Sequence, residues 1–183
     1  MSEIAAMYAD GGVIQINPSP IGGTWAWCHV NADGERIASA SAIVIPRISC
    51  PLITNNLTEM IALVRGLAAL PEGWSGVVYS DSQITLGRMF EGWKMNAIPP
   101  VLIRQGIAAK ARLNWRQCTY VLLDGHPTKA QLLAGKGKRG QPVSEHNVWC
   151  DKECVRVGKE FLEAAQICAE QSCNETNHPQ VYP

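Results

Sequence analysis

Two acidic residues that could carry out chemistry stand where short apolar runs end. Asp10 follows the run from Ile4 to Ala9, and Asp81 follows the run from Gly76 to Ser80. Each run has the length of a buried strand, and the carboxyl ends of parallel strands meet at one edge of an open sheet, where ligands bind. We therefore expect Asp10 and Asp81 to lie side by side at that edge.

Two further carboxylates are expected to reach the same edge from helices. Glu59 lies in a helix that the apolar spacing from Leu57 to Ala68 predicts, and Asp151 lies in the last predicted helix, from about His146 to about Glu170. Carboxylates held this close repel one another unless cations lie between them. Oxygen ligands favour magnesium or manganese, and a pair of such ions is a common device for hydrolysing phosphodiesters.

Each of these carboxylates also has a purely structural interpretation. Asp10 could start a turn, and Asp81 could cap the helix that follows it. Glu59 could close a capping box with Asn56. Asp151 could simply be favoured by the partial positive charge at a helix N-terminus. Only the four residues taken together favour a functional site.

The remaining elements predict an α/β fold with a mixed sheet. The segments from Thr24 to Val30 and from Glu35 to Ile45 are rich in β-favouring residues and flank a turn at 31–34. A third buried strand runs from Cys118 to Leu123, and a Gly-His-Pro corner containing His126 follows it. A β-meander followed by alternating strands and helices indicates helices packed on the faces of the sheet.

Length and composition limit the kind of protein. The chain has 183 residues, 46% of them hydrophobic, so we expect one domain at 1–170 and a flexible tail at 171–183. Lys plus Arg and Asp plus Glu number 16 each, so any nucleic-acid binding must come from local patches. No apolar stretch approaches the roughly 18 residues that a membrane-spanning helix needs, no export signal is recognised, and the seven cysteines include no Cys-x-x-Cys pair. We expect a cytoplasmic monomer with reduced thiols, no membrane partner and no small-molecule cofactor.

Five short blocks, read together, resemble the type 1 ribonuclease H family over about residues 4–165. The blocks are Tyr8-Ala9-Asp10-Gly11-Gly12 with the loop 17–23, Thr54-Asn55-Asn56-Leu57-Thr58-Glu59, Ser80-Asp81-Ser82-Gln83, Gly125-His126 and Asn147-Val148-Trp149-Cys150-Asp151. The resemblance implies a five-stranded mixed sheet with helices on both faces. It also implies cleavage of the RNA strand of RNA/DNA hybrids.

The resemblance assigns a role to each acidic residue. It makes Asp10, Glu59, Asp81 and Asp151 the ligands of two Mg²⁺ ions, for which Mn²⁺ could substitute, and makes His126 the catalytic histidine that assists proton transfer or product release. One ion would activate the attacking water and the other would neutralise charge on the departing 3′ oxygen, leaving 5′-phosphate and 3′-hydroxyl ends.

The resemblance also points to polar residues that would bind the hybrid. Asparagine and glutamine carry both a donor and an acceptor, which suits contacts with ribose 2′-hydroxyl groups, and a threonine hydroxyl suits a DNA-strand phosphate. The matching residues are Asn17, Thr54, Asn55, Asn56 and Gln83. Ordinary turn and capping roles are the alternative for each of them.

The chain departs from the family pattern in two places. The lysine-rich helical protrusion that many bacterial members carry after the third block is short here, with only scattered cations before Cys118. An enlarged loop separates His126 from Asp151, and its run at 135–140 contains three cations. We expect these cations to contact the hybrid backbone, with a solvated mobile loop as the alternative. They are Lys136, Lys138 and Arg139. The insertion also leaves His146 as a competing catalytic histidine.

Two other functions are compatible with these motifs. One is a DNA-cutting nuclease of the same fold, against which Asn17, Asn55 and Asn56 speak because they match positions that recognise RNA. The other is a catalytically silent interaction module with this fold. The presence of all four carboxylates speaks against the silent module.

Overall fold

The fold is built on one mixed sheet of five strands, in the order β3-β2-β1-β4-β5. The computed structural model describes residues 3–175, with side chains up to residue 168. The strands are β1 (Ile4–Val13), β2 (Gly23–Asn31), β3 (Arg36–Val44), β4 (Val77–Ser80) and β5 (Thr119–Leu122). The first three form an antiparallel meander, and β4 and β5 continue from β1 in parallel. The predicted mixed sheet is confirmed.

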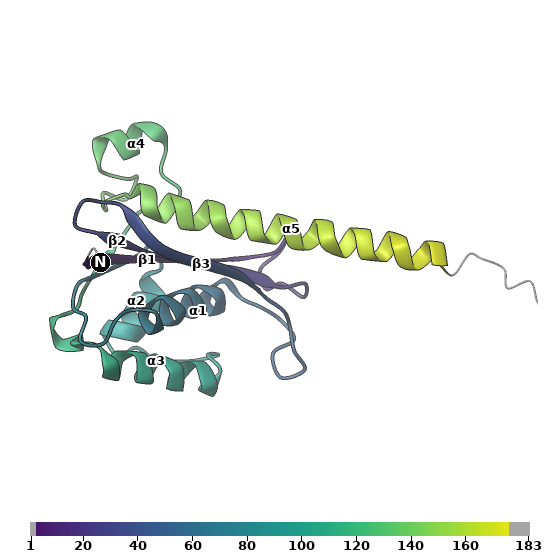
Figure 1. Ribbon diagram of the computed structural model, residues 1–183, viewed down its shortest axis with the longest axis horizontal. Coiled ribbons are helices and arrows are strands. Elements are labelled where there is room, and N and C mark those ends of the chain that lie inside the picture. The colour runs from purple at the N-terminus through teal and green to yellow at the C-terminus, as the bar shows by residue number, and fades with distance from the viewer. Residues whose placement is uncertain (1–2, 176–183) are drawn as a thin grey trace, which may run out of the picture.

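Helices cover both faces of the sheet, as predicted (Figure 1). On one face lie α1 (Asn55–Ala68), α2 (Gln83–Phe90) and α3 (Pro100–Arg112); on the other lies α5 (Glu145–Glu175), with the short α4 (Lys129–Ala134) near its start. Apolar side chains from β1 and α1 form the larger core, which includes Met7, Met60 and Leu63. A smaller core under α5 includes Cys28 and Cys150, whose sulfur atoms lie 3.9 Å apart.

The first strand is longer than predicted, and Asp10 lies inside it rather than at its end. The parallel pairing of β1 with β4 stops at Tyr8 and Tyr79, but β1 remains paired with β2 through Val13. The sequence Gly11-Gly12 resembles a turn, yet both residues continue the antiparallel ladder. Asp10 therefore lies just beyond the parallel half of β1, still held firmly by β2.

Three helices differ from expectation. The helix α3 is not predicted from the sequence, although its buried Leu102, Gly106 and Ala109 recur at helical spacing against α1. The segment that forms α4 is expected to be part of a loop but is helical. The last helix continues to Glu175, beyond the predicted start of the tail, and residues 176–183 lie outside the described part of the chain. Between residues 3 and 175, the helices are all too short or too polar to span a membrane.

Candidate active site

Asp10 is buried on β1, next to the point where α1 approaches the strand most closely. Its side chain is only 7% exposed, and Oδ1 accepts a 2.7 Å hydrogen bond from the backbone nitrogen of Gly11. A Cβ on Gly11 would lie 2.3 Å from the backbone nitrogen of Glu59. Glycine is therefore needed at this position, because its missing side chain lets the strand and the helix bring Asp10 and Glu59 together.

Glu59 is held in place by its neighbours on α1 and α2. Thr54 caps α1 and accepts a 3.3 Å hydrogen bond from the first turn. Asn55 Nδ2 donates to Glu59 Oε1 at 2.9 Å, and Thr85 Oγ1 donates to Glu59 Oε2 at 3.4 Å. The alternative of a capping box between Asn56 and Glu59 is wrong, because Asn56 already lies within the helix.

Asp81 occupies the short connection between β4 and α2. Ser82, not Asp81, caps α2 by accepting a hydrogen bond from the first turn, so the capping alternative for Asp81 is wrong. A Cβ on Gly125 would lie 2.3 Å from Asp81 Oδ2. The side chain of Asn147, which is only 3% exposed, also hydrogen-bonds to Asp81. Residues from the loop after β5 and from α5 thus fix a carboxylate in the connection after β4.

One of the two candidate histidines lies with the carboxylates. His126 Nδ1 is 3.4 Å from Asp151 Oδ2, and the His126 side chain is 78% exposed. Its backbone adopts a left-handed conformation, with φ of 49°. The ring of His146 instead packs against Tyr8, at 5.0 Å between ring centroids, and does not line the cavity that contains the carboxylates.

The predicted acidic residues share one cavity of about 570 Å³. Its walls come from β1, α1, α5 and the loops that follow β4 and β5. The carboxylates and the histidine that line it are Asp10, Glu59, Asp81, His126 and Asp151. Four segments that are far apart in the sequence thus deliver their carboxylates to a single site.

Burial makes negative charge costly in this cavity. It raises the pKa of Asp10 well above its ordinary value, and the nearby Asp81 raises it further. Burial also raises the pKa of Glu59 to about 7, and it raises the pKa of Asp81 even though His126 acts in the opposite direction. Among residues 3–168, no ion pair involves Asp10, Glu59 or Asp81. A bound cation would therefore stabilise the ionised forms of all three.

The donor set fits a hard divalent cation. All the acidic ligands are carboxylate oxygens, which suit Mg²⁺ and Mn²⁺. Within the described side chains, no three His, Cys, Asp or Glu residues are arranged to hold a single ion. Mg²⁺ commonly keeps several water ligands when one or two carboxylates bind it.

Among the polar residues predicted to bind substrate, Asn55 is the one that lines the cavity. Asn17 lies beside it, because Asn17 Oδ1 accepts a 3.2 Å hydrogen bond from the Asn55 backbone nitrogen. Asn56 and Gln83 are exposed in the first turns of α1 and α2, and Thr54 acts as the helix cap. The structure thus gathers these residues near the start of α1 and α2 but places only Asn55 in the cavity.

The cations of the 135–140 loop have different surroundings. Arg139 Nε lies 2.5 Å from Asp124 Oδ1, and the Arg139 backbone nitrogen donates to Asp124 Oδ2 at 2.7 Å. Burial alone would raise the pKa of Asp124, but these hydrogen bonds hold it below its ordinary value. Asp124 thus neutralises Arg139 within the chain, whereas Lys136 and Lys138 make no ion pair with the described residues.

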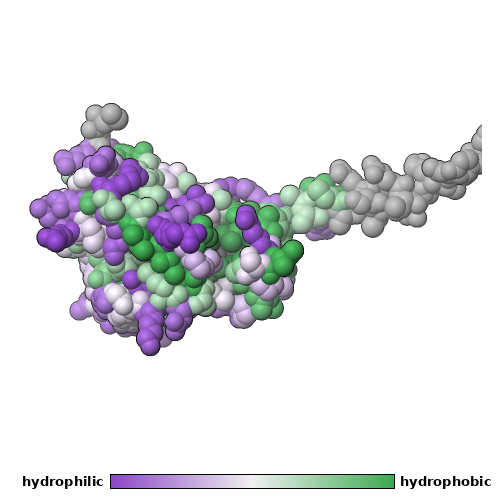
Figure 2. Space-filling model, turned by 90° about the horizontal axis from the view of Figure 1, so that it is seen from below, coloured by the Kyte–Doolittle hydropathy of each residue, from purple (hydrophilic) through white to green (hydrophobic). Residues whose placement is uncertain are grey.

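The region after the third block forms no basic protrusion. Arg88, Lys110 and Arg112 all donate to backbone carbonyl groups of the protein itself. Trp93 packs over Gly87, where a Cβ would lie 2.4 Å from the ring. Figure 2 shows the face that carries α3, on which hydrophilic and hydrophobic side chains are interspersed.

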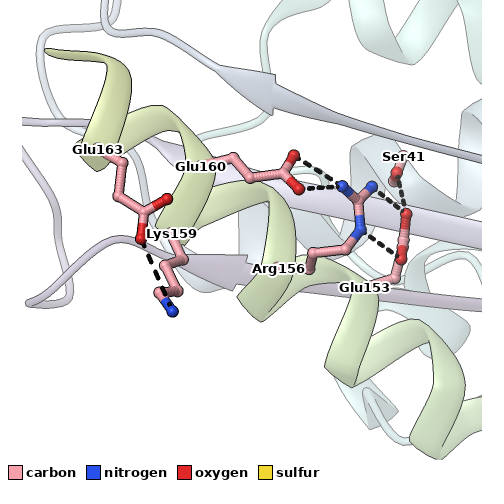
Figure 3. A network of polar contacts seen from close by, with 6 residues as sticks. All are labelled: Ser41, Glu153, Arg156, Lys159, Glu160 and Glu163. Atoms are coloured by element: carbon pink, nitrogen blue, oxygen red, sulfur yellow. Dashed lines mark hydrogen bonds and ion pairs between the residues drawn. The ribbon is translucent and has the colours of Figure 1, made fainter. Parts of the chain in front are cut away.

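Sequence analysis missed a cation at the rim of the cavity. Lys159 lines the cavity from α5, with a 75% exposed side chain and its Nζ 3.7 Å from Glu163 Oε1. By contrast, Arg156 is fully engaged by Glu153 and Glu160, and Glu153 also accepts a hydrogen bond from β3 (Figure 3). Lys159 lies eight residues after Asp151, a spacing that shares one helical face and could have identified it.

Comparisons with known proteins identify the fold. No protein-family model and no curated protein matches the chain. Among solved structures, the N-terminal RNase H domain of a Mycobacterium tuberculosis protein is 18% identical, with a TM-score of 0.57, over 89% of this chain and 99% of that one. RNase H1 from Halobacterium salinarum is 18% identical, with a TM-score of 0.55, over 85% and 97%.

A third similar structure contains a nucleic acid. LC11-RNase H1, isolated from compost by a metagenomic approach, was solved in complex with an RNA/DNA hybrid. It is 19% identical to this chain, with a TM-score of 0.57, and the match covers 86% of this chain and 98% of that one. The likeness spans nearly the whole length of each neighbour. The chain therefore has the RNase H-like fold.

Proposed function

We propose that this protein is a metal-dependent endoribonuclease that hydrolyses the RNA strand of RNA/DNA hybrids. The observation that carries the proposal is the convergence of Asp10, Glu59, Asp81 and Asp151, together with His126, in one cavity of an RNase H-like fold. One similar structure, an RNase H1, holds an RNA/DNA hybrid, which supports this choice of substrate.

The four carboxylates would hold two Mg²⁺ ions, with Mn²⁺ as a possible substitute. When bound, such ions lower the pKa of water and neutralise charge that develops on phosphate oxygens. The fit rests on the oxygen-only donor set and on the raised pKa values of Asp10, Glu59 and Asp81, because each carboxylate would be easier to ionise beside a cation.

Neighbouring side chains would position the substrate and move protons. His126 is highly exposed, and its Nδ1 faces Asp151, so it can exchange a proton between the cavity and solvent. Asn55 Nδ2 is committed to Glu59, which leaves Asn55 Oδ1 to accept a hydrogen bond from a ribose 2′-hydroxyl. That contact would distinguish RNA from DNA beside the carboxylates.

A cleavage assay tests the proposal directly. End-labelled RNA/DNA hybrid, DNA/DNA and RNA/RNA duplexes of the same sequence are incubated with the protein in Mg²⁺ or in EDTA. We expect cleavage of the RNA strand of the hybrid only, in Mg²⁺ only, with 5′-phosphate and 3′-hydroxyl products, and we expect Asp81→Asn to abolish it.

The same assay distinguishes the alternatives. Cleavage of the DNA/DNA duplex would favour a DNA-cutting nuclease of this fold. Failure to cleave any duplex in either Mg²⁺ or Mn²⁺ would contradict the proposal and favour a silent interaction module.

A further inference from the structure

A second polar cavity adjoins the candidate active site. It measures about 510 Å³ and lies between the end of β5 and the insertion that contains α4. Asp81 and His126 line both this cavity and the cavity of the carboxylates. Thr128, Gln131 and Lys138 come from the insertion and line the second cavity alone. A strand cleaved at the carboxylates could therefore continue directly into it.

The wall that the insertion provides is held together by its own hydrogen bonds. Thr128 and Gln131 form a reciprocal capping box at the start of α4. The segment after α4 folds back on itself. Lys136 and Pro142 form an isolated antiparallel β-bridge, and the Gly137 backbone nitrogen donates a hydrogen bond to the Gln141 carbonyl. The insertion thus has a regular internal hydrogen-bonding pattern, although most of its residues are exposed to solvent.

Asp124 anchors this wall to the sheet. A Cβ on Gly137 would lie 2.3 Å from Asp124 Cβ, so the backbone of the insertion packs directly on this buried residue. Arg139 closes the contact through its ion pair with Asp124 and a 3.2 Å hydrogen bond from Nη2 to the Leu123 carbonyl. The guanidinium group of Arg139 therefore has a structural role: it holds the insertion against the end of β5.

Besides Asp81 and His126, which it shares with the first cavity, and the Asp124–Arg139 ion pair, the second cavity presents hydrogen-bond donors and a cation. Lys138 makes no ion pair or hydrogen bond among the described residues. Gln131 Oε1 accepts from the Thr128 backbone at 2.8 Å, which leaves the Nε2 donors of Gln131 available. An ammonium group next to an amide donor suits an anionic oxygen, and phosphate is the anion that recurs along a nucleic-acid strand.

We propose that this cavity is a subsite for a backbone phosphate of the cleaved strand, adjoining the scissile one, with Lys138 as its principal ligand and Gln131 as a second donor. The inference rests on the proposed function. The RNA strand that is cleaved beside Asp81 would place its next phosphate in the second cavity, because Asp81 lines both cavities. It also gives two of the three cations of the 135–140 loop different roles: Lys138 binds substrate, and Arg139 holds the wall in place.

The test measures binding of the hybrid to a variant that is expected not to cleave it. Fluorescence anisotropy of a labelled RNA/DNA hybrid is recorded for the Asp10→Asn protein in Mg²⁺ at several salt concentrations, with and without Lys138→Ala. We expect Lys138→Ala to weaken binding at low salt and to reduce the salt-dependence slope by about 0.9, the loss of one phosphate contact. Lys129→Ala is the matched control, because Lys129 is an exposed cation on the same insertion that lines neither cavity.

A modified substrate locates the contact. A single 2′-deoxy methylphosphonate step removes one phosphate charge, and the same 2′-deoxy step with an ordinary phosphate is its control. We expect one position beside the cleavage site at which neutralisation weakens binding of the Asp10→Asn protein but causes no further loss when Lys138 is also alanine. The subsite would be overturned by equal salt slopes for the Lys138→Ala and Lys129→Ala proteins. It would also be overturned if the losses of affinity caused by the methylphosphonate and by Lys138→Ala were additive at every position of the substrate tested.

Failure of the subsite is distinguishable from failure of the proposed function. If the wild-type protein cleaves the hybrid but the Lys138 results are negative, the subsite alone is wrong. If the wild-type protein cleaves no hybrid, the proposed function fails and the subsite fails with it. Melting temperatures of all variants, which should match that of the parent because Lys138 is exposed, exclude a folding defect.

Discussion

Gly125 lies directly against the carboxylate of Asp81, so that a Cβ there would be 2.3 Å from Asp81 Oδ2. A real Cβ cannot occupy that position unless the carboxylate moves. Because the contact is with the end of a side chain rather than with backbone, Gly125→Ala should displace Asp81 without disrupting the fold. We expect kcat on an RNA/DNA hybrid to fall at least ~100-fold, as small displacements of catalytic groups do, with a nearly unchanged melting temperature.

Gly106→Ala provides the matched control for this substitution. Gly106 lies in α3, where a Cβ would make an ordinary 3.4 Å contact with Val64. Alanine should keep full activity and raise stability by up to about 1 kcal/mol, the helix-propensity difference from glycine. Equal activity for Gly125→Ala and the wild type would show that Asp81 is not held in this position for catalysis.

Divalent cations should stabilise the folded protein through the carboxylates. A ligand that binds only the folded state at 100 times its Kd adds about 2.7 kcal/mol, which for a chain of this size raises the melting temperature by about 5–10 °C. Thermal denaturation with Mg²⁺ or Mn²⁺ and with EDTA measures the effect. We expect Asp10→Asn to lose most of the shift and Asp33→Asn, in an exposed turn, to retain it. A full shift in Asp10→Asn would place the ion elsewhere.

Without divalent ions, stability should fall as pH rises. Burial raises the pKa of Glu59 from 4.5 to about 7, so between these values the unfolded chain loses a proton that the folded protein keeps. The free energy of unfolding therefore declines over this window, by about 3 kcal/mol for Glu59, and levels off above it. Asp10 and Asp81, whose pKa values are also raised, should add to the decline.

Urea denaturation in EDTA from pH 4 to pH 8 measures this dependence. Glu59→Gln should flatten the curve, since glutamine carries no proton to lose, whereas Glu72→Gln, at an exposed position, should follow the wild type. Parallel curves for Glu59→Gln and the wild type would mean that Glu59 ionises in the folded protein as readily as in the unfolded chain.

The convergence of Asp10 and Asp81 could be predicted because it depends on neighbouring parallel strands. Each residue follows a short apolar run, and adjacent parallel strands place their carboxyl ends together. The length of β1 could not be predicted in the same way. Gly11-Gly12 has the composition of a turn, and only the antiparallel pairing with β2 and the close approach of α1 show why glycine is needed there.

Only part of the second cavity could be predicted from the sequence. Thr128 and Gln131 have the spacing of a capping box, so the start of α4 carried a local signal. The pairing of Asp124 with Arg139 carried none, since it joins two segments whose approach depends on how the insertion folds back. For this reason the three cations of the loop looked equivalent in the sequence, although their surroundings differ.

Lys159 should contribute to substrate binding rather than to the chemical step. It lines the cavity from α5, and its exposed side chain has one ion-pair partner, Glu163, whereas Arg156 is paired with both Glu153 and Glu160. We expect Lys159→Ala to raise KM for the hybrid several-fold at ~50 mM salt with little change in kcat, and the difference to shrink as salt rises. Lys152→Ala, also on α5 but outside the cavity, should leave both constants unchanged.

Alanine substitutions of His126 and His146 should have different effects on the kinetics of cleavage. His126 contacts Asp151 in the cavity, so His126→Ala should lower kcat by ~10²-fold, in the range of general acid-base catalysis. Its high exposure means that stability should barely change.

His146→Ala should show the opposite pattern, because His146 packs against Tyr8 outside the cavity. Loss of this ring contact should lower the free energy of unfolding by about 1 kcal/mol while kcat stays close to that of the wild type. Steady-state cleavage kinetics and urea denaturation of both variants check the assignment. A large loss of kcat in His146→Ala, with His126→Ala unaffected, would reverse the roles of the two histidines and show that proton transfer does not depend on the contact between His126 and Asp151.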